Sequence, residues 1–269
     1  MKKNLPWIMA GVLVACVVIV ILWPRKETTE PPTAVTPEPP AEVTEPPVVE
    51  PPPPPPVAQE PEVQVEPLPA LEDSDAEIRR SLVELADSEA VQTYVVPAGI
   101  IRKMVVTVDN LPRDKVSMRV RAIPDLPGRF AVSGSEDAPL LGEANFVRYR
   151  PFVAAVDALD AVRVVEQYRR WYPLFQQAYE ELGYPGKALH SRVIECIDDL
   201  LAAPQVPAGT RLVRPKVLYE FADPDLEARS AGQKMLMRMG PENAARVKSK
   251  LQEIRDRLTQ QSEAGWPAE

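Results

Sequence analysis

A regular stripe of apolar side chains runs through residues 160–182. Its members recur every three or four positions, which is the spacing of one face of an α-helix. They are Ala161, Val164, Val165, Tyr168, Trp171, Tyr172, Phe175, Ala178, Tyr179 and Leu182. Gly183 follows directly and suits the position after a helix end, where a left-handed backbone is common. The pattern therefore predicts a long amphipathic helix.

The same spacing predicts shorter helices on both sides of this stripe. One begins at the sequence SDAE of residues 74–77, which has the form of a capping box. Others are expected over residues 98–110, 187–202 and 223–239, and a last helix begins at Pro241. Several turns of helix are thus expected in most of the C-terminal two thirds of the chain.

Residues 111–141 interrupt the helical pattern with several prolines and glycines. They predict a long loop with one or two short strands, near residues 119–123 and 129–132. The predicted fold is mainly α: a compact domain of six or seven helices over residues 71–262, with at most a small β element. The tail, residues 263–269, is expected to fray.

The most apolar stretch of the chain is residues 7–23, which contains no charged side chain. As a helix it would be about 25 Å long, slightly less than the hydrocarbon core of a bilayer. Trp7 and Trp23 lie at its ends, where aromatic side chains mark membrane interfaces. We expect residues 1–24 to be a membrane anchor, with the lipid bilayer as the partner of its transmembrane helix.

Three other interpretations fit this segment less well than a passive anchor does. A cleaved signal peptide would have a shorter apolar region, followed by a small-residue cleavage site. The sequence LVAC at residues 13–16 has the form of a lipoprotein signal, but apolar residues continue beyond Cys16. A proton-coupled motor helix would carry an ionisable residue within the span, and none is present.

Lysine and arginine are equally numerous on the two sides of the apolar stretch, so charge alone does not orient it. A short N-terminal tail before a large C-terminal region is the usual layout of a bacterial signal anchor. We expect a single-pass protein of the bacterial inner membrane, with its N-terminus in the cytoplasm and its C-terminal domain periplasmic or otherwise outside the cytoplasm.

Residues 25–70 differ in composition from everything that follows. Between residues 31 and 69 there are 16 prolines, seven glutamates and no basic side chain. Proline fixes φ and removes a hydrogen-bond donor, so this composition predicts a disordered, extended linker. Proline-rich ligands of aromatic grooves usually carry a basic residue, which is missing here, and we therefore favour a stiff acidic spacer over a recognition motif.

Charge and composition exclude several functions. The net charge is −8, and residues 30–69 alone contribute −8, so the folded region is close to neutral and carries no basic patch typical of nucleic-acid binding. The chain has one histidine, His190, and two cysteines, of which Cys196 lies on an apolar helical stripe. We expect no metal site, no cofactor and no catalytic residue.

Two groups of residues are candidates for contact with a partner or a glycan. Arg148, Tyr149 and Arg150 combine aromatic and cationic groups outside the main apolar stripe. Asp223 and Glu227 lie in the acidic sequence DPDLE, where Asp223 also suits a helix N-cap. The capping role is the simpler explanation of that acidic sequence, and acid–base chemistry is the alternative.

Several short sequences together resemble a known family. They are VDNLP at 108–112, RYRPF at 148–152, YPL at 172–174, AYEELGY at 178–184, LLAAP at 200–204, YEFADPDLE at 219–227 and RMGPEN at 238–243. In these sequences the chain resembles the bacterial domain-of-unknown-function family 3014, over roughly residues 70–260. The resemblance implies a membrane anchor, a proline-rich linker and this C-terminal domain, and it implies no catalytic residues.

The sequence therefore predicts a membrane-tethered protein of the cell envelope. We expect a non-enzymatic binding or scaffolding module that a stiff acidic linker holds away from the membrane. Its expected partners are an envelope protein or a cell-wall component. The alternative is a cell-envelope hydrolase that uses carboxylates such as Asp223 and Glu227.

Overall fold

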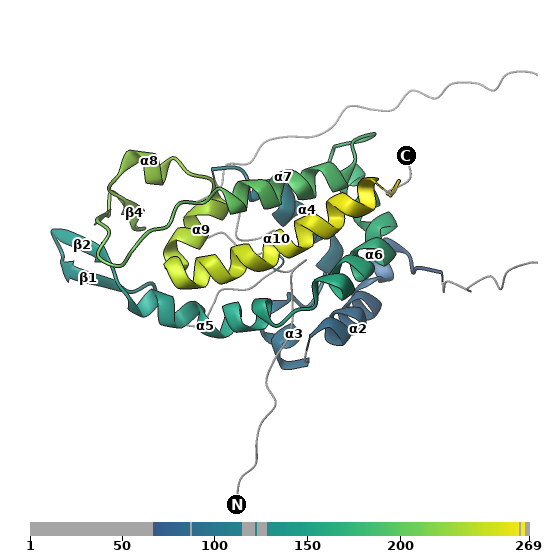
Figure 1. Ribbon diagram of the computed structural model, residues 1–269, viewed down its shortest axis with the longest axis horizontal. Coiled ribbons are helices and arrows are strands. Elements are labelled where there is room, and N and C mark those ends of the chain that lie inside the picture. The colour runs from purple at the N-terminus through teal and green to yellow at the C-terminus, as the bar shows by residue number, and fades with distance from the viewer. Residues whose placement is uncertain (1–66, 87, 115–121, 123–127, 264, 267–269) are drawn as a thin grey trace, which may run out of the picture. The chain divides into compact units, whose positions relative to one another are not determined.

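The fold is described from a computed structural model of the whole chain (Figure 1). The described residues are 67–86, 88–114, 122, 128–263 and 265–266. The predicted transmembrane segment and residues 25–66 of the predicted linker lie outside them. Among the described residues, none of the helices combines the length and apolar character that crossing a membrane requires.

Helices make up most of the described chain. A short 3₁₀ helix, η1 (Leu71–Asp73), comes first. The α-helices that follow are α2 (Asp75–Leu85), α3 (Ser88–Tyr94), α4 (Ile100–Asn110), α5 (Ala144–Asp157), α6 (Ala161–Glu181), α7 (Leu189–Leu201), α8 (Pro224–Glu227), α9 (Ala231–Met239) and α10 (Pro241–Glu263). The predicted mainly α class is confirmed, although nine α-helices in the described residues exceed the expected six or seven.

The β structure consists of two antiparallel pairs. Strand β1 (Val132–Ser135) pairs with β2 (Ala138–Leu141), and β3 (Leu212–Val213) pairs with β4 (Glu220–Phe221). A single bridge between Leu140 and Arg211 connects the two pairs. The small β element was expected earlier in the chain; of the predicted strands, the one at residues 129–132 meets β1 only at Val132, and the one at 119–123 lies largely outside the described residues.

The main hydrophobic core is organised around two long helices. The last helix, α10, packs against α5, α6, α7 and α9, while α6 also packs against α4 and α2 (Figure 1). Trp171 and Phe175 of α6 and Phe152 of α5 are almost completely buried. A second, smaller core lies beside the strands and contains Leu141, Val206, Leu212, Phe221 and Met237. The predicted apolar stripe of residues 160–182 thus lies in the main core, except that Leu182 is exposed and Tyr172 is only partly buried.

Two helices were not expected from the sequence, α3 and α5. In α5, Pro151 lies inside the helix, where it removes a backbone hydrogen bond at a cost of about 3 kcal/mol. The helix nevertheless buries Tyr149, Phe152, Val153 and Val156, and each buried side chain of this size contributes about 1.5–3 kcal/mol. Tertiary burial therefore outweighs the local effect of proline.

The predicted helix over residues 223–239 is wrong as a single element. It is interrupted after Glu227, and α9 begins anew at Ala231 with Ser230 as its N-cap. The backbone N–H groups of Ala231 and Gly232 donate to the carbonyl oxygens of Arg113 and Leu111, at 2.8 and 3.0 Å. The break lets the first turn of α9 dock on the segment that follows α4, a contact that local sequence does not reveal.

Candidate functional site

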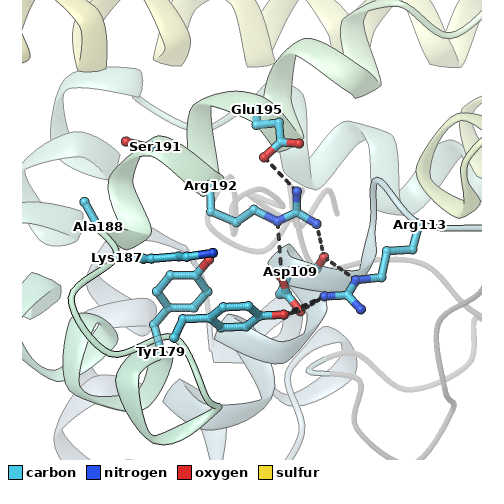
Figure 2. A pocket seen from close by; sticks show the side chains of 9 residues that line it. Asp109, Arg113, Tyr179, Lys187, Ala188, Ser191, Arg192 and Glu195 are labelled. Carbon is cyan, nitrogen blue, oxygen red and sulfur yellow. Dashed lines mark hydrogen bonds and ion pairs between the residues drawn. The ribbon is translucent and has the colours of Figure 1, made fainter.

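A hollow of about 580 Å³ lies at the surface between the end of α4, the end of α6 and the beginning of α7 (Figure 2). Charged and tyrosine side chains dominate its lining. The lining residues are Asp109, Arg113, Tyr179, Tyr184, Lys187, Ala188, Ser191, Arg192 and Glu195. Because these residues come from three helices, the turn after α4 and the loop between α6 and α7, only the tertiary fold brings them together.

Asp109 is the centre of the polar contacts in this hollow. Its side chain is 6% exposed, and three donors reach its carboxylate. Arg192 Nε donates to Oδ1 at 3.2 Å, while Arg113 Nη2 and the Tyr184 hydroxyl donate to Oδ2 at 2.7 and 3.3 Å. Figure 2 shows Arg192 above Asp109 and Arg113 to its right, so the two arginines approach it from different sides. A buried carboxylate with this many donors is fully satisfied and holds both guanidinium groups in place.

Arg192 connects α7 to α4 through several contacts. Besides the side chain of Asp109, it binds the backbone carbonyl oxygen of Asp109 and, at 2.7 Å, the carboxylate of Glu195. Burial disfavours the charged form of Arg192, but its bond to Glu195 and the charge of Asp109 raise its pKa above the ordinary value. Arg192 therefore stays cationic at every physiological pH.

Arg113 is the more exposed of the two arginines. Its Nη2 donates to both Asp109 and Tyr184, and its Nε donates to the carbonyl oxygen of Asp109 at 3.3 Å. Burial opposes the charge on Arg113, yet the hydrogen bonds to Asp109 and Tyr184 raise its pKa above the ordinary value. The side chain is therefore both cationic and held in one orientation.

Two tyrosines form one side of the hollow. The rings of Tyr179 and Tyr184 are stacked, with centroids 4.6 Å apart and planes inclined by 20°. Lys187 Nζ lies 5.6 Å from the centroid of the Tyr184 ring, within cation–π range. Burial, together with the charge of Asp109, raises the pKa of Tyr179, so its phenol stays protonated at neutral pH.

The chemistry of the hollow suits binding better than proton transfer. Its arginines stay charged and Tyr179 stays protonated, and no histidine is among its lining residues. Within the described part of the chain, no cluster of histidine, cysteine and carboxylate side chains could hold a metal ion. What the hollow offers is a set of oriented N–H donors beside aromatic rings.

The structure does not bring Arg148, Tyr149 and Arg150 together as one surface. All three lie on α5, where Tyr149 is buried in the core and Arg150 is exposed. Arg148 donates to the carbonyl oxygen of Gly128 at 3.2 Å and lies 5.3 Å from the Tyr149 ring centroid. Arg150 is the member of this group that a partner would reach most easily.

Asp223 is the N-cap of α8 and Glu227 is its last residue, and both have structural partners. Asp223 Oδ1 accepts the backbone N–H of Asp225 at 2.9 Å, which confirms the predicted N-cap. Glu227 accepts the backbone N–H of Phe221 at 2.9 Å, and its other oxygen pairs with Lys234 at 3.0 Å. These contacts tie α8 to β4 and α9, and they account for both carboxylates without an acid–base role.

His190 and Cys196 are both buried. Cys196 is fully buried in the main core, as its place on the apolar stripe predicts. His190 Nε2 lies 2.7 Å from the Ser262 hydroxyl, which also donates to the Leu258 carbonyl oxygen at 3.0 Å. Burial lowers the pKa of His190, so its imidazole is neutral at neutral pH.

The sequence did not identify Asp109, Arg113 and Arg192 as site residues, although one signal was present. Asp109 lies four residues after Val105 and eight after Ile101, on the apolar face of a predicted helix. A carboxylate at such a position must find partners inside the fold. The sequence offers many arginines, and nothing local selects Arg192, which lies 83 positions away from Asp109.

The fold and the hollow define a mainly α-helical domain with a polar surface site and no recognisable catalytic constellation among its described residues. The chain belongs to the family described as Protein of unknown function (DUF3014), whose model matches residues 100–255. This match confirms the resemblance seen in the sequence and includes every residue that lines the hollow. Neither a curated protein nor a solved structure matches the chain.

Proposed function

We propose that the protein is a membrane-tethered, non-enzymatic binding module of the bacterial cell envelope. The apolar segment at residues 7–23 supports a membrane anchor, and the proline- and glutamate-rich residues 25–70 support a stiff spacer. On this proposal the bilayer holds one end of the chain. The helical domain then binds an envelope protein or a cell-wall component at some distance from the membrane.

The hollow beside α4, α6 and α7 is the binding surface in this proposal. The observation that carries it is the buried carboxylate of Asp109, which holds Arg113 and Arg192 in place around a surface depression. A buried ion pair is rarely the most stable way to fill a core, since apolar residues of similar volume often do so better. Charged groups at such a site are therefore better explained by recognition than by stability.

Photo-crosslinking in intact cells tests this surface. A photoreactive residue replaces Ser191, which lines the hollow and is exposed, and the matched control replaces the exposed Val162 near the start of α6. We expect a discrete envelope partner to be captured from position 191 and not from position 162. Equal labelling patterns from the two positions would exclude the hollow as the binding surface.

The alternative function, a hydrolase that uses Asp223 and Glu227, predicts that the protein itself degrades cell-wall material. Purified full-length protein would then release products from cell-wall fragments, and the double variant D223N/E227Q would abolish this without changing the melting temperature. We expect no release, and a lower melting temperature for the double variant, because both carboxylates hold α8 in place.

Reporter fusions test the membrane part of the proposal. A reporter that is active only outside the cytoplasm should be active when fused after Glu269, and a reporter that is active only in the cytoplasm should be silent there. The reverse result would place the domain in the cytoplasm. Deleting residues 1–24 should release the protein from the membrane fraction.

A further inference from the structure

We propose that the hollow binds a carboxylate group of its ligand between the side chains of Arg113 and Lys187. This inference rests on the proposed binding function and names the chemical class that the site would recognise. It follows from the charges around the hollow, from the N–H donors that remain unused, and from the way Tyr184 places the two cations.

The charges of the hollow leave a net excess of one positive charge. Arg113, Lys187 and Arg192 face two carboxylates, Asp109 and Glu195, so three positive charges stand against two negative ones. Asp109 is buried and its oxygens already accept three hydrogen bonds. The exposed charges of the hollow are therefore those of Arg113, Lys187 and Glu195, of which two are positive.

Arg113 offers the best oriented free donor. Two of its nitrogens, Nε and Nη2, are fixed by Asp109 and Tyr184, while within the described residues Nη1 has no hydrogen-bond partner. The Arg113 side chain is 48% exposed, so a ligand can approach it from solvent. A guanidinium group that is already held in place loses less conformational entropy when a carboxylate binds.

Lys187 supplies the second cation. Its side chain is exposed, and among the described residues it makes no ion pair; its ammonium group lies 5.6 Å from the centroid of the Tyr184 ring. The hydroxyl of the same tyrosine accepts a hydrogen bond from Arg113 at 2.7 Å. Tyr184 therefore contacts both cations, and stacking on Tyr179 holds its ring in position.

A carboxylate fits this arrangement better than a phosphate. One negative charge neutralises the excess charge of the hollow, whereas a phosphate dianion would leave a net negative charge close to Glu195 and Asp109. Arginine and lysine together provide charge-assisted hydrogen bonds, which are roughly twice as strong as those between neutral groups. We therefore assign the site to a monoanionic carboxylate, such as the C-terminus of a peptide.

Isothermal titration of the full-length protein in a nonionic detergent tests the assignment with three small probes. They are N-acetyl-alanyl-alanine, the C-terminal amide of the same dipeptide, and inorganic phosphate. We expect the acid to bind, the amide to bind at least about tenfold more weakly, and phosphate to bind more weakly than the acid. Higher salt should weaken binding of the acid, because the cations are partly exposed.

Variants locate the binding within the hollow. Loss of one charge-assisted bond corresponds to roughly a tenfold or greater loss of affinity, which is the expectation for R113Q, and K187Q should lose about three- to tenfold. The matched control is R102Q on α4: Arg102 is also ion-paired and is 42% exposed, but it does not line the hollow. Its affinity for the acid should equal that of the unchanged protein.

Several results would overturn the assignment. They are equal affinity for acid and amide, tighter binding of phosphate, or an equal loss of affinity in R102Q and R113Q. If none of the probes binds while position 191 still crosslinks to its envelope partner, the carboxylate assignment is wrong and the binding module stands. If the acid binds as expected and the crosslink is absent, the proposed partner surface is wrong instead.

Discussion

Replacing Asp109 by asparagine should lower the free energy of unfolding of the domain by about 3 kcal/mol. Asparagine has nearly the same shape as aspartate, so the change removes the charge and leaves the packing of α4 in place. It also turns one of the two carboxylate oxygens into an N–H donor. That donor would face the N–H groups of Arg192, or those of Arg113 and the hydroxyl of Tyr184.

The magnitude follows from burial on both sides of the contact. The Asp109 side chain is 6% exposed and that of Arg192 is 15% exposed, so the guanidinium group left behind cannot be solvated fully. Removing one partner of a buried ion pair costs about 3–5 kcal/mol. We take the lower end because Arg192 keeps its contact with Glu195 and with the backbone carbonyl of Asp109.

Thermal and urea unfolding, followed by circular dichroism, measure the effect on the full-length protein. For a domain of about 200 residues, 3 kcal/mol corresponds to a fall in melting temperature of roughly 6–12 °C. The matched control is D157N, which removes the partner of Arg246 in an ion pair at 2.8 Å. Asp157 is 44% exposed, and exposed pairs contribute about 0–1 kcal/mol, so this variant should unfold close to the unchanged protein.

A double-mutant cycle with R192M separates the pair from its surroundings. If Asp109 acts mainly through Arg192, the double variant D109N/R192M should be less destabilised than the sum of the single variants, by more than about 1 kcal/mol. Additive effects would refute the argument that these two residues form one buried unit. So would a D109N variant that is no less stable than D157N.

Three further predictions concern other parts of the chain. Gly240 has φ of +87°, and a Cβ there would lie 2.5 Å from the Phe146 ring, so G240A should lower the free energy of urea unfolding by about 2–4 kcal/mol. The control G209A should lower it by about 1 kcal/mol, because φ of Gly209 is +80° but no atom lies within 4 Å of its Cβ position. Equal losses in the two variants would contradict the clash with Phe146. Burial lowers the pKa of His190, so its contribution to stability is present above about pH 6.5 and is lost as pH falls below it, and H190Q should flatten this part of the stability–pH curve relative to the unchanged protein. Halving the linker of residues 31–69 should weaken a cellular phenotype while shuffling its order at full length should not, and failure of the shuffled linker would favour recognition of its sequence.

Much of the helical layout was predictable because burial leaves a periodic trace in the sequence. Helices α6, α7 and α10 follow their apolar stripes closely, and Asp223 caps α8 as its position before Pro224 predicts. The family could also be recognised from short sequences, because the matched region contains all of them. These features depend on neighbours three or four positions apart, which the sequence shows directly.

The sequence-based helix predictions were wrong where contacts between residues far apart in the sequence determine the local structure. Helix α5 contains Pro151 and the exposed Arg150, which locally favour a loop, and it forms because its other face is buried against α10. The break between α8 and α9 exists because the amides of Ala231 and Gly232 bind carbonyl oxygens beyond α4. In both places the energy gained from tertiary contacts exceeds the local preference.

The candidate site likewise depends on contacts between residues that are far apart in the sequence. A mainly helical domain, its family and the composition of the segments before it could be read from the residues alone. The folded structure was needed to show that Asp109, Tyr184 and Arg192 lie around one hollow, while Arg148, Tyr149 and Arg150 do not form one surface. The reason is physical: helical periodicity records which face of a helix is buried, but it contains no information about which charged groups, 75 or 83 positions apart, will meet there.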